Sequence, residues 1–198
     1  SGAMNACALV SGLSNGGVDQ AKQTLSDLWR AVSAKYSELF QPGPSGLWDK
    51  VVGLDYPAPL DSYLTLTRTF SPYQLNPFNL NPLRTILEDH IDFAAIQKSA
   101  SISLHIGTTQ VRTGKMRIFT NEEISADVLL ASACLPSLHQ AIEIDGESYW
   151  DGGYSGNPPL FPLIFNSKYP DIVVVLLEPL MRESGPKTAE EIRNRSNE

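Results

Sequence analysis

Apolar residues recur at helical spacing near the start of the chain. Between residues 19 and 40 they fall on one stripe of a long amphipathic helix: Leu25, Leu28, Trp29, Val32, Tyr36, Leu39 and Phe40. A run of small residues at 3–13 predicts a preceding helix, and the glycines of 12–17 predict the loop between the two. We interpret the stripe as core-facing, because amphipathic helices usually bury their apolar side against their own domain. A binding face is the alternative.

Farther along, the apolar pattern becomes that of strands. Residues 102–109 and 115–119 predict two strands joined by a turn, and residues 141–150 predict a hairpin that turns at Asp145-Gly146. The run 171–177 is apolar almost throughout and rich in valine. Such a run is typical of a strand that is buried on both faces of a parallel or mixed sheet.

Helices are predicted between these strands. Asn81-Pro82 combines an N-cap with a proline at the first helical position and predicts a helix through His90. Further short helices are predicted at 93–98 and 125–133. Helices that alternate with strands predict an α/β layered fold. The 198 residues suit one hydrophobic core, so we expect a single domain over 1–198.

Composition and charge argue against several classes of protein. The chain has 15 Lys and Arg against 22 Asp and Glu, a net charge of −7, and no basic cluster. A nucleic-acid partner is therefore not expected, because phosphate binding needs clustered cations. No apolar run approaches the roughly 20 residues of a membrane-spanning helix. Cys7 and Cys134 lack the spacing of metal ligands, and we expect both to be buried free thiols.

One aspartate lies between an aromatic strand end and a glycine turn, in the segment Tyr149-Trp150-Asp151-Gly152-Gly153. Asp-Gly pairs are common in ordinary turns, since both residues adopt unusual backbone angles at low cost. Spacing alone therefore does not distinguish this aspartate from that of the hairpin turn at Asp145-Gly146. A carboxylate at a sharp turn is also well placed for chemistry, and the local residues leave both interpretations open.

Two separate segments resemble the patatin-like phospholipase family. One is similar to the family's aspartate region, where a small-residue helix that ends in proline precedes DGG or DGA and then N-x-P. In this chain the order is the stretch 132–136, a hairpin, Asp151-Gly152-Gly153 and then Asn157-Pro158. The start of the chain, Ser-Gly-Ala-Met-Asn-Ala at 1–6, is similar to the second half of the family's nucleophile elbow, G-x-S-x-G-A-[IM]-N-A. Both matches occur in the family's order.

The resemblance implies a three-layer α/β/α sandwich of the patatin type, incomplete at its N-terminus. It implies a lipid acyl hydrolase, phospholipase or esterase, that uses a Ser-Asp dyad and an acyl-enzyme. In this chain Asp151 matches the base, Gly152 and Gly153 match the turn glycines, and Asn157 matches a position that we expect to be structural. The resemblance implies no metal or other cofactor, and its partner is a phospholipid or another acyl ester.

The register at the N-terminus decides where the nucleophile is expected. Gly2 aligns with the closing glycine of G-x-S-x-G, so the serine is expected immediately before Ser1. Ser1 as the nucleophile is the alternative, but it would place Ala3 at the closing glycine. The family's oxyanion-hole glycines precede the elbow, and a continuation after residue 198 is expected. We therefore expect these 198 residues by themselves to be inactive on esters.

Histidine is the usual base of serine hydrolases, and the chain has three. His90 ends a predicted helix, His105 lies in a predicted strand, and only His139 lies near Asp151 in the sequence. We expect surface or core roles for all three. Two other functions stay open: a noncatalytic lipid-binding module on the same fold, and an acyltransferase that passes the acyl group to an alcohol.

The stretch 41–81 contains six prolines interleaved with apolar residues, among them Trp48 and Phe70, and predicts neither a long helix nor a flexible linker. We interpret it as an ordered excursion over the sheet that lines an acyl pocket or packs on its own domain. Lipid substrates imply transient contact with a membrane surface, for which this excursion is the candidate. The compartment cannot be read from the sequence; a cytoplasmic or peripheral membrane location is favoured.

Overall fold

The computed structural model describes residues 2–40, 66–67, 69–156, 158–167, 169–175, 181 and 185–188. Their contacts divide the chain into two compact units, Ser1–Pro159 and Leu160–Glu198, which we describe separately. The single domain expected over 1–198 stays a prediction. Trp48 and most of the proline-rich stretch lie outside the described residues.

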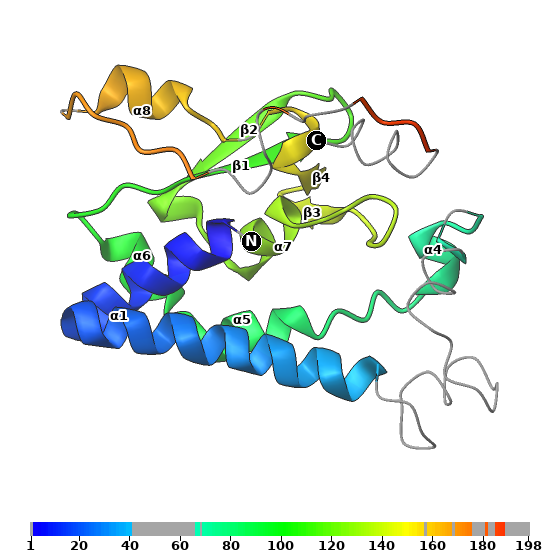
Figure 1. Ribbon diagram of the computed structural model, residues 1–198, viewed down its shortest axis with the longest axis horizontal. Helices are drawn as coiled ribbons and strands as arrows, with labels where there is room; N and C mark the ends of the chain where they lie inside the picture. The colour runs from blue at the N-terminus through cyan, green and yellow to red at the C-terminus, as the bar shows by residue number, and fades with distance from the viewer. Residues whose placement is uncertain are drawn as a thin grey trace. The chain divides into compact units, whose positions relative to one another are not determined.

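The first unit is built on a four-stranded antiparallel sheet (Figure 1). Its strands are β1 (His105–Gln110), β2 (Met116–Thr120), β3 (Ile142–Ile144) and β4 (Glu147–Asp151), in the order β2-β1-β4-β3. The strands predicted at 102–109 and 115–119 and the predicted hairpin are confirmed. Asp145 and Gly146 have φ angles of 52° and 79°, which a two-residue hairpin turn requires.

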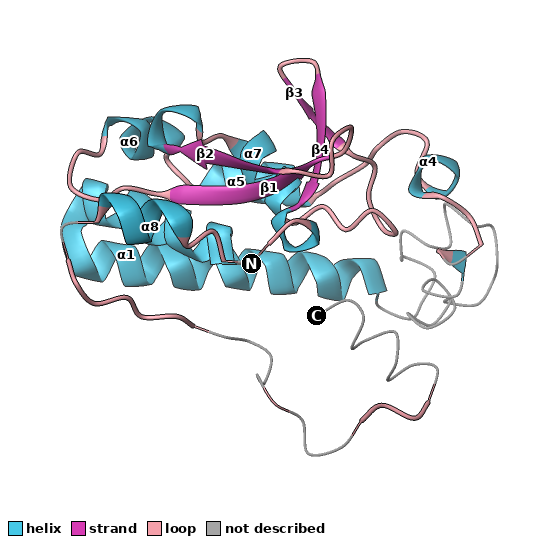
Figure 2. Cartoon of the chain, turned by 90° about the horizontal axis from the view of Figure 1, so that it is seen from above, coloured by secondary structure: helices cyan, strands magenta, loops and turns pink. Residues whose placement is uncertain are grey.

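The described residues of this unit also form several helices (Figure 2). They are α1 (Gly2–Phe40), α4 (Pro72–Leu75), α5 (Leu83–His90), α6 (Phe93–Lys98) and α7 (Ala126–Ser132), with a 3-10 turn η1 at Asn121–Glu123. Gly16 and Gly17 leave helical geometry, so α1 consists of two helices joined at a kink, as the glycines predict. Side-chain hydrogen bonds mark the starts of α5 and α7. Asn81 Oδ1 accepts the Leu83 N–H at 3.1 Å, and Ser125 Oγ accepts the Val128 N–H at 3.4 Å.

The core lies between the sheet and these helices. Figure 1 shows α1, α5, α6 and α7 on one side of the sheet. Helix α7 packs on β1, β3 and β4, and α1 packs on α5, α6 and α7. The core-facing prediction for the stripe of α1 is confirmed for Leu28, which is buried, and for Leu25, which packs against the core. It is wrong for Trp29 and Tyr36, which are 37% and 60% exposed. Among the described side chains of α1, the last one in the buried core is that of Leu28; the side chains of Leu39 and Phe40 are not among those described.

The fold class is α/β, as predicted, with helices packed on an antiparallel sheet. The three-layer sandwich stays a prediction. Among the described residues, no helix is both long enough and apolar enough to cross a membrane.

The second unit contains α8 (Phe161–Asn166) and the start of the apolar run. The strand predicted at 171–177 is wrong for 171–175, which form no strand; the last two residues lie outside the described ones. Val173 is 89% and Val175 is 84% exposed. A strand buried on both faces needs neighbouring strands for its backbone hydrogen bonds and covering layers for its side chains.

Candidate functional site

Strand β4 ends at Asp151, and the carboxylate of that residue organises the turn that follows. Asp151 is the N-cap of the 3-10 turn η2 (Gly152–Tyr154), and its Oδ1 accepts the Gly153 N–H at 2.8 Å. No hydrogen bond to Oδ2 occurs among the described residues. The carboxylate is thus oriented through one oxygen, and the other is available as a proton acceptor.

Strand alternation determines the side of the sheet that Asp151 faces. Side chains two residues apart in a strand share a face, so Asp151 faces the same side as Tyr149. Tyr149 is buried in the cluster that also contains Met4 and Cys7 from the beginning of α1. Figure 1 shows the N-terminus on this helical side of the sheet. The strand end and the N-terminal helix therefore share one core.

Three long-range contacts hold the backbone around Asp151. Its N–H donates to the Cys134 carbonyl at 2.9 Å, and its carbonyl accepts the Thr109 hydroxyl at 2.8 Å. The Thr109 oxygen also lies 2.8 Å from Ser155 Oγ, beyond the turn. In the ladder, Thr108 is the residue opposite Asp151. The position of the carboxylate thus depends on β1 and on the end of α7.

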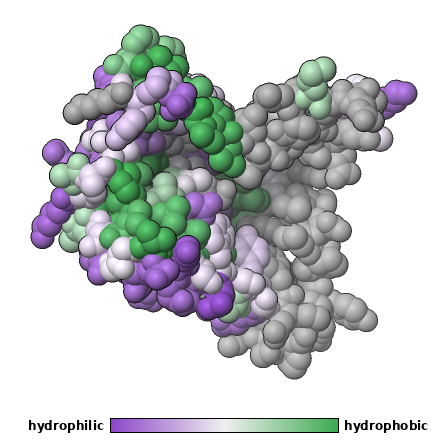
Figure 3. Space-filling model, turned by 60° about the vertical axis from the view of Figure 1, so that its left-hand side comes forward, coloured by the Kyte–Doolittle hydropathy of each residue, from purple (hydrophilic) through white to green (hydrophobic). Residues whose placement is uncertain are grey.

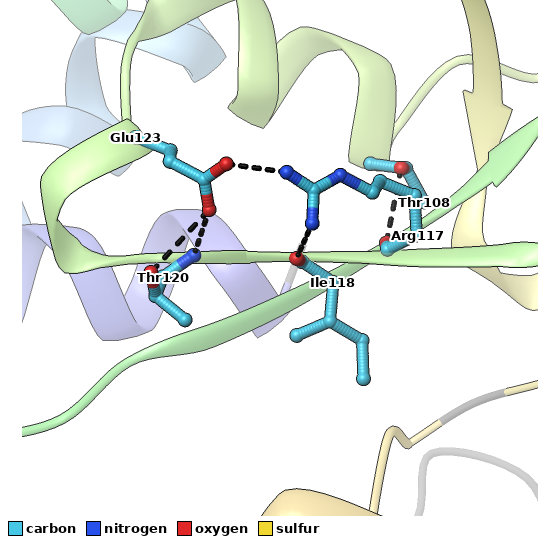
Figure 4. Close-up of polar contacts among 5 residues, drawn as sticks. All are labelled: Thr108, Arg117, Ile118, Thr120 and Glu123. Atoms are coloured by element: carbon cyan, nitrogen blue, oxygen red, sulfur yellow. Dashed lines mark hydrogen bonds and ion pairs between the residues drawn. The ribbon is translucent and has the colours of Figure 1, made fainter.

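A polar network anchors β1 on its other edge (Figure 4). The Thr108 hydroxyl donates to the Arg117 carbonyl at 3.2 Å. The Arg117 guanidinium pairs with Glu123 and donates to the Ile118 carbonyl at 2.9 Å. Glu123 in turn accepts the Thr120 N–H at 3.0 Å. Residues of β2 and η1 therefore hold β1, the strand that pairs with β4 at Asp151, in place.

The two glycines after Asp151 differ in how much space surrounds them. A Cβ on Gly152 would lie 2.5 Å from the Gly107 carbonyl oxygen, so only glycine fits this close approach to β1. A Cβ on Gly153 would meet only Asp151 Oδ1, at 3.2 Å. Gly152 therefore allows the turn to pack closely against β1. Gly153 instead donates its N–H to the Asp151 carboxylate, whose Oδ1 is the only atom among the described residues that a Cβ at this position would meet.

The structure distinguishes the two Asp-Gly pairs that spacing leaves equivalent. Asp145 lies exposed at a hairpin tip in the left-handed region, whereas Asp151 is half-buried at a strand end and caps a turn. Sequence reasoning missed Thr109 and the carbonyl of Cys134 as supports. The signal for the first was the pair Thr108-Thr109, two polar residues inside a predicted strand, both of which are buried.

The remaining predicted site residues lie at the margins of this arrangement. Gly2 is the first residue of α1, exposed, with open space where a Cβ would be. Ser1 and Asn157 lie outside the described residues, so their roles stay predictions. The neighbour of Asn157, Gly156, has a φ of 148°, and Pro159 packs over Gly107.

The described contacts connect none of the three histidines to Asp151. His90 Nδ1 lies 2.9 Å from the Ile86 carbonyl oxygen, and His105 Nδ1 is buried without a partner among the described residues. His139 lies at the surface, where partial desolvation of the ring lowers its pKa. No group of three or more His, Cys, Asp or Glu in the described part of the chain is placed to hold a metal.

Cys134 adjoins the site but is not a nucleophile at neutral pH. Its thiol is buried and donates to the Gln140 carbonyl at 3.2 Å. Burial, with a smaller contribution from the Asp151 charge, raises its pKa to about 11. The reactive form of a cysteine is the thiolate, so this residue has a structural role.

The surface also carries an open groove of about 510 Å³ on α1, lined by Lys22, Leu25, Ser26, Trp29, Arg30 and Ser33. None of these residues comes from β4 or the turn after it. Among the described residues no carboxylate lines the groove, whereas the aspartate region has one with a defined orientation. The aspartate region is therefore the better candidate for the catalytic site.

Comparison with known proteins identifies a family for most of the chain. The family model of patatin-like phospholipase matches residues 1–164, which include both α1 and the aspartate turn. No curated protein and no solved structure matches the chain. Because the family model spans well over half of the sequence, the chain belongs to the patatin-like phospholipase family.

Proposed function

We propose that the protein is a lipid acyl hydrolase, a phospholipase or esterase, in which Asp151 is the base for a serine that immediately precedes Ser1 in the complete protein. Membership of the family supports hydrolysis of lipid acyl esters. The observation that supports the residue assignment is the Asp151 carboxylate, oriented through Oδ1 by Gly153 N–H on the face of the sheet that shares a core with α1.

The reaction follows from these groups. Asp151 Oδ2 accepts the serine hydroxyl proton while the serine oxygen attacks the ester carbonyl, and the tetrahedral intermediate forms. Collapse of the intermediate breaks the bond to the alcohol, which leaves with the proton from Asp151, and an acyl-enzyme results. Water then attacks the acyl-enzyme and gives one proton to the same carboxylate. As the fatty acid leaves, Asp151 passes this proton to the serine oxygen, which restores the free serine and the ionised carboxylate.

Asp151→Asn in the complete protein tests the base role. Asn keeps an oxygen that accepts the Gly153 N–H but cannot take a proton, so we expect kcat to fall about 100- to 10,000-fold. The substrate is a p-nitrophenyl ester of medium chain length. Asp145→Asn is the matched control, since Asn tolerates the left-handed angles of the exposed hairpin tip and full activity is expected.

Two results would decide against the dyad. Near wild-type turnover by Asp151→Asn would refute the role of Asp151. His139 is a surface residue with no hydrogen bond to Asp151 among the described contacts, so its replacement should leave the aspartate turn intact. A fall in kcat of several orders of magnitude in His139→Ala would therefore indicate a histidine base instead.

Contact with a membrane surface is the second part of the proposal. The described end of the proline-rich stretch exposes apolar side chains: Phe70 at 44%, Phe78 at 83% and Leu80 at 63%. Gln140 Nε2 donates to the Asn76 carbonyl at 2.7 Å, and this hydrogen bond links the segment to the part of the chain just before β3. Figure 3 brings the side of the molecule away from α4 forward, and apolar side chains gather into patches there as well.

Replacement of the exposed aromatic residues tests this contact. Phe70→Ser and Phe78→Ser should weaken cosedimentation with phosphatidylcholine vesicles, because each removes apolar area that the lipid would cover. The midpoint of urea unfolding should stay unchanged, since both side chains are exposed. Unaltered vesicle binding by the double variant would exclude this segment as the contact.

A further inference from the structure

The turn that Asp151 caps places one side chain beside the carboxylate. A 3-10 turn has three residues per turn, so side chains three positions apart lie on the same face. Asp151 is the N-cap of η2 and Tyr154 is its third residue, two positions whose groups approach each other at the start of a helical turn, and the two residues between them are glycines. Tyr154 is therefore the only residue of η2 with a side chain that can reach the Asp151 carboxylate.

Tyr154 is also held in place without being part of the core. Its side chain is 52% exposed. The residues after it return to the start of the turn: the Ser155 and Gly156 N–H groups donate to the Gly152 carbonyl at 3.1 and 3.0 Å. An exposed aromatic ring on a backbone held in this way is available to a ligand.

The electrostatic environment keeps this phenol a hydrogen-bond donor. Partial burial and then the charge of Asp151 raise the pKa of Tyr154 above its usual value. The hydroxyl is therefore protonated at neutral pH. Asp151 offers only acceptor oxygens, and so does an acyl ester, whose carbonyl, alkoxy and phosphodiester oxygens accept. An ester held beside Asp151 requires a donor, and on this turn the side chain that supplies one is the Tyr154 phenol.

We propose that Tyr154 positions the ester: its hydroxyl donates a hydrogen bond to an oxygen of the alcohol portion of the substrate, and its ring packs against the adjoining carbon chain. This inference rests on the proposed function, since it assumes that Asp151 serves ester cleavage. Tyr154 takes no proton from the substrate and forms no bond to it. Its effect is therefore on how well the ester is held beside the carboxylate.

The experiment compares Tyr154→Phe, Tyr154→Ala and Asp151→Asn in the complete protein, with a p-nitrophenyl ester and with phosphatidylcholine in mixed micelles. Loss of one hydrogen bond is expected to raise KM about 3- to 10-fold in Tyr154→Phe with little change in kcat. Tyr154→Ala also loses the ring contact, so its KM should rise further. Tyr169→Phe, at an 80% exposed tyrosine, is the control and should behave as wild type.

The outcomes separate this inference from the function on which it rests. If Asp151→Asn is inactive while both Tyr154 variants keep wild-type KM and kcat, Tyr154 does not position the substrate and the dyad stands. A fall in kcat at unchanged KM would likewise overturn the positioning role. If Asp151→Asn is fully active, the proposed function itself fails. Tyr154→Phe keeps the ring, so it remains informative even if Tyr154→Ala does not fold.

Discussion

Gly152→Ala tests whether the aspartate turn depends on the close approach of two backbones. The added Cβ would lie 2.5 Å from the Gly107 oxygen and 2.8 Å from the Gly107 carbon, well inside normal contact distance. Both atoms belong to the backbone of β1, which is paired with β2 on one edge and with β4 on the other. They cannot move aside as the end of a flexible side chain would.

The expected cost follows from two opposing effects. Overpacking of this kind destabilises by about 1–3 kcal/mol. Replacement of glycine also lowers the entropy of the unfolded chain, which stabilises by about 0.4–1 kcal/mol. The free energy of unfolding should therefore fall by about 1–2 kcal/mol, which for a chain of this size lowers Tm by roughly 2–8 °C.

Urea unfolding followed by tryptophan fluorescence measures the change, with the slope m used to check that the transition itself is unaltered. Gly153→Ala is the matched control: the same entropy is gained, but the Cβ would meet only the Asp151 carboxylate oxygen, at 3.2 Å. Its stability should stay within about 0.5 kcal/mol of wild type. Equal midpoints for wild type, Gly152→Ala and Gly153→Ala would refute the steric argument.

Three further predictions concern the support of the fold. Gly12→Ala should destabilise the packing of the two halves of α1, because its Cβ would lie 2.7 Å from the Ala21 nitrogen; thermal unfolding measures the loss. Asp92→Ala should cost about 1 kcal/mol, because Asp92 caps α6, whereas Asp92→Asn keeps the cap. The hydrogen bond from the backbone of α6 lowers the pKa of Asp92 in the folded state, so the stability that its charge contributes is present above pH about 4 and is lost as the pH falls through the lowered value. The stability difference between wild type and Asp92→Asn should therefore vanish in acid. Burial raises the pKa of Cys7 to about 12 and that of Cys134 to about 11, so iodoacetamide at pH 8 should modify both slowly in the native protein and rapidly in urea; fast native labelling would contradict the burial.

Local chemistry explains which elements could be predicted from the sequence. The caps at Asn81 and Ser125 and the hairpin turn at Asp145-Gly146 depend on groups within a few residues of one another, and the structure has all three. The family could also be recognised from the sequence, since each of its two motifs is a short continuous segment of the chain. The apolar run 171–175 does not form the buried strand that its hydropathy predicts, because burial of a strand depends on distant neighbours that hydropathy does not reveal.

The sequence by itself determined the helices and hairpin, the family, and Asp151 as the candidate base. Only the tertiary structure decided how Asp151 differs from Asp145: it is half-buried, oriented by Gly153, and supported by Thr109 and the Cys134 carbonyl. Hydrogen bonds across a sheet and steric limits between backbones join residues more than forty positions apart or on different elements. No local pattern records such partners, because they depend on how the elements pack.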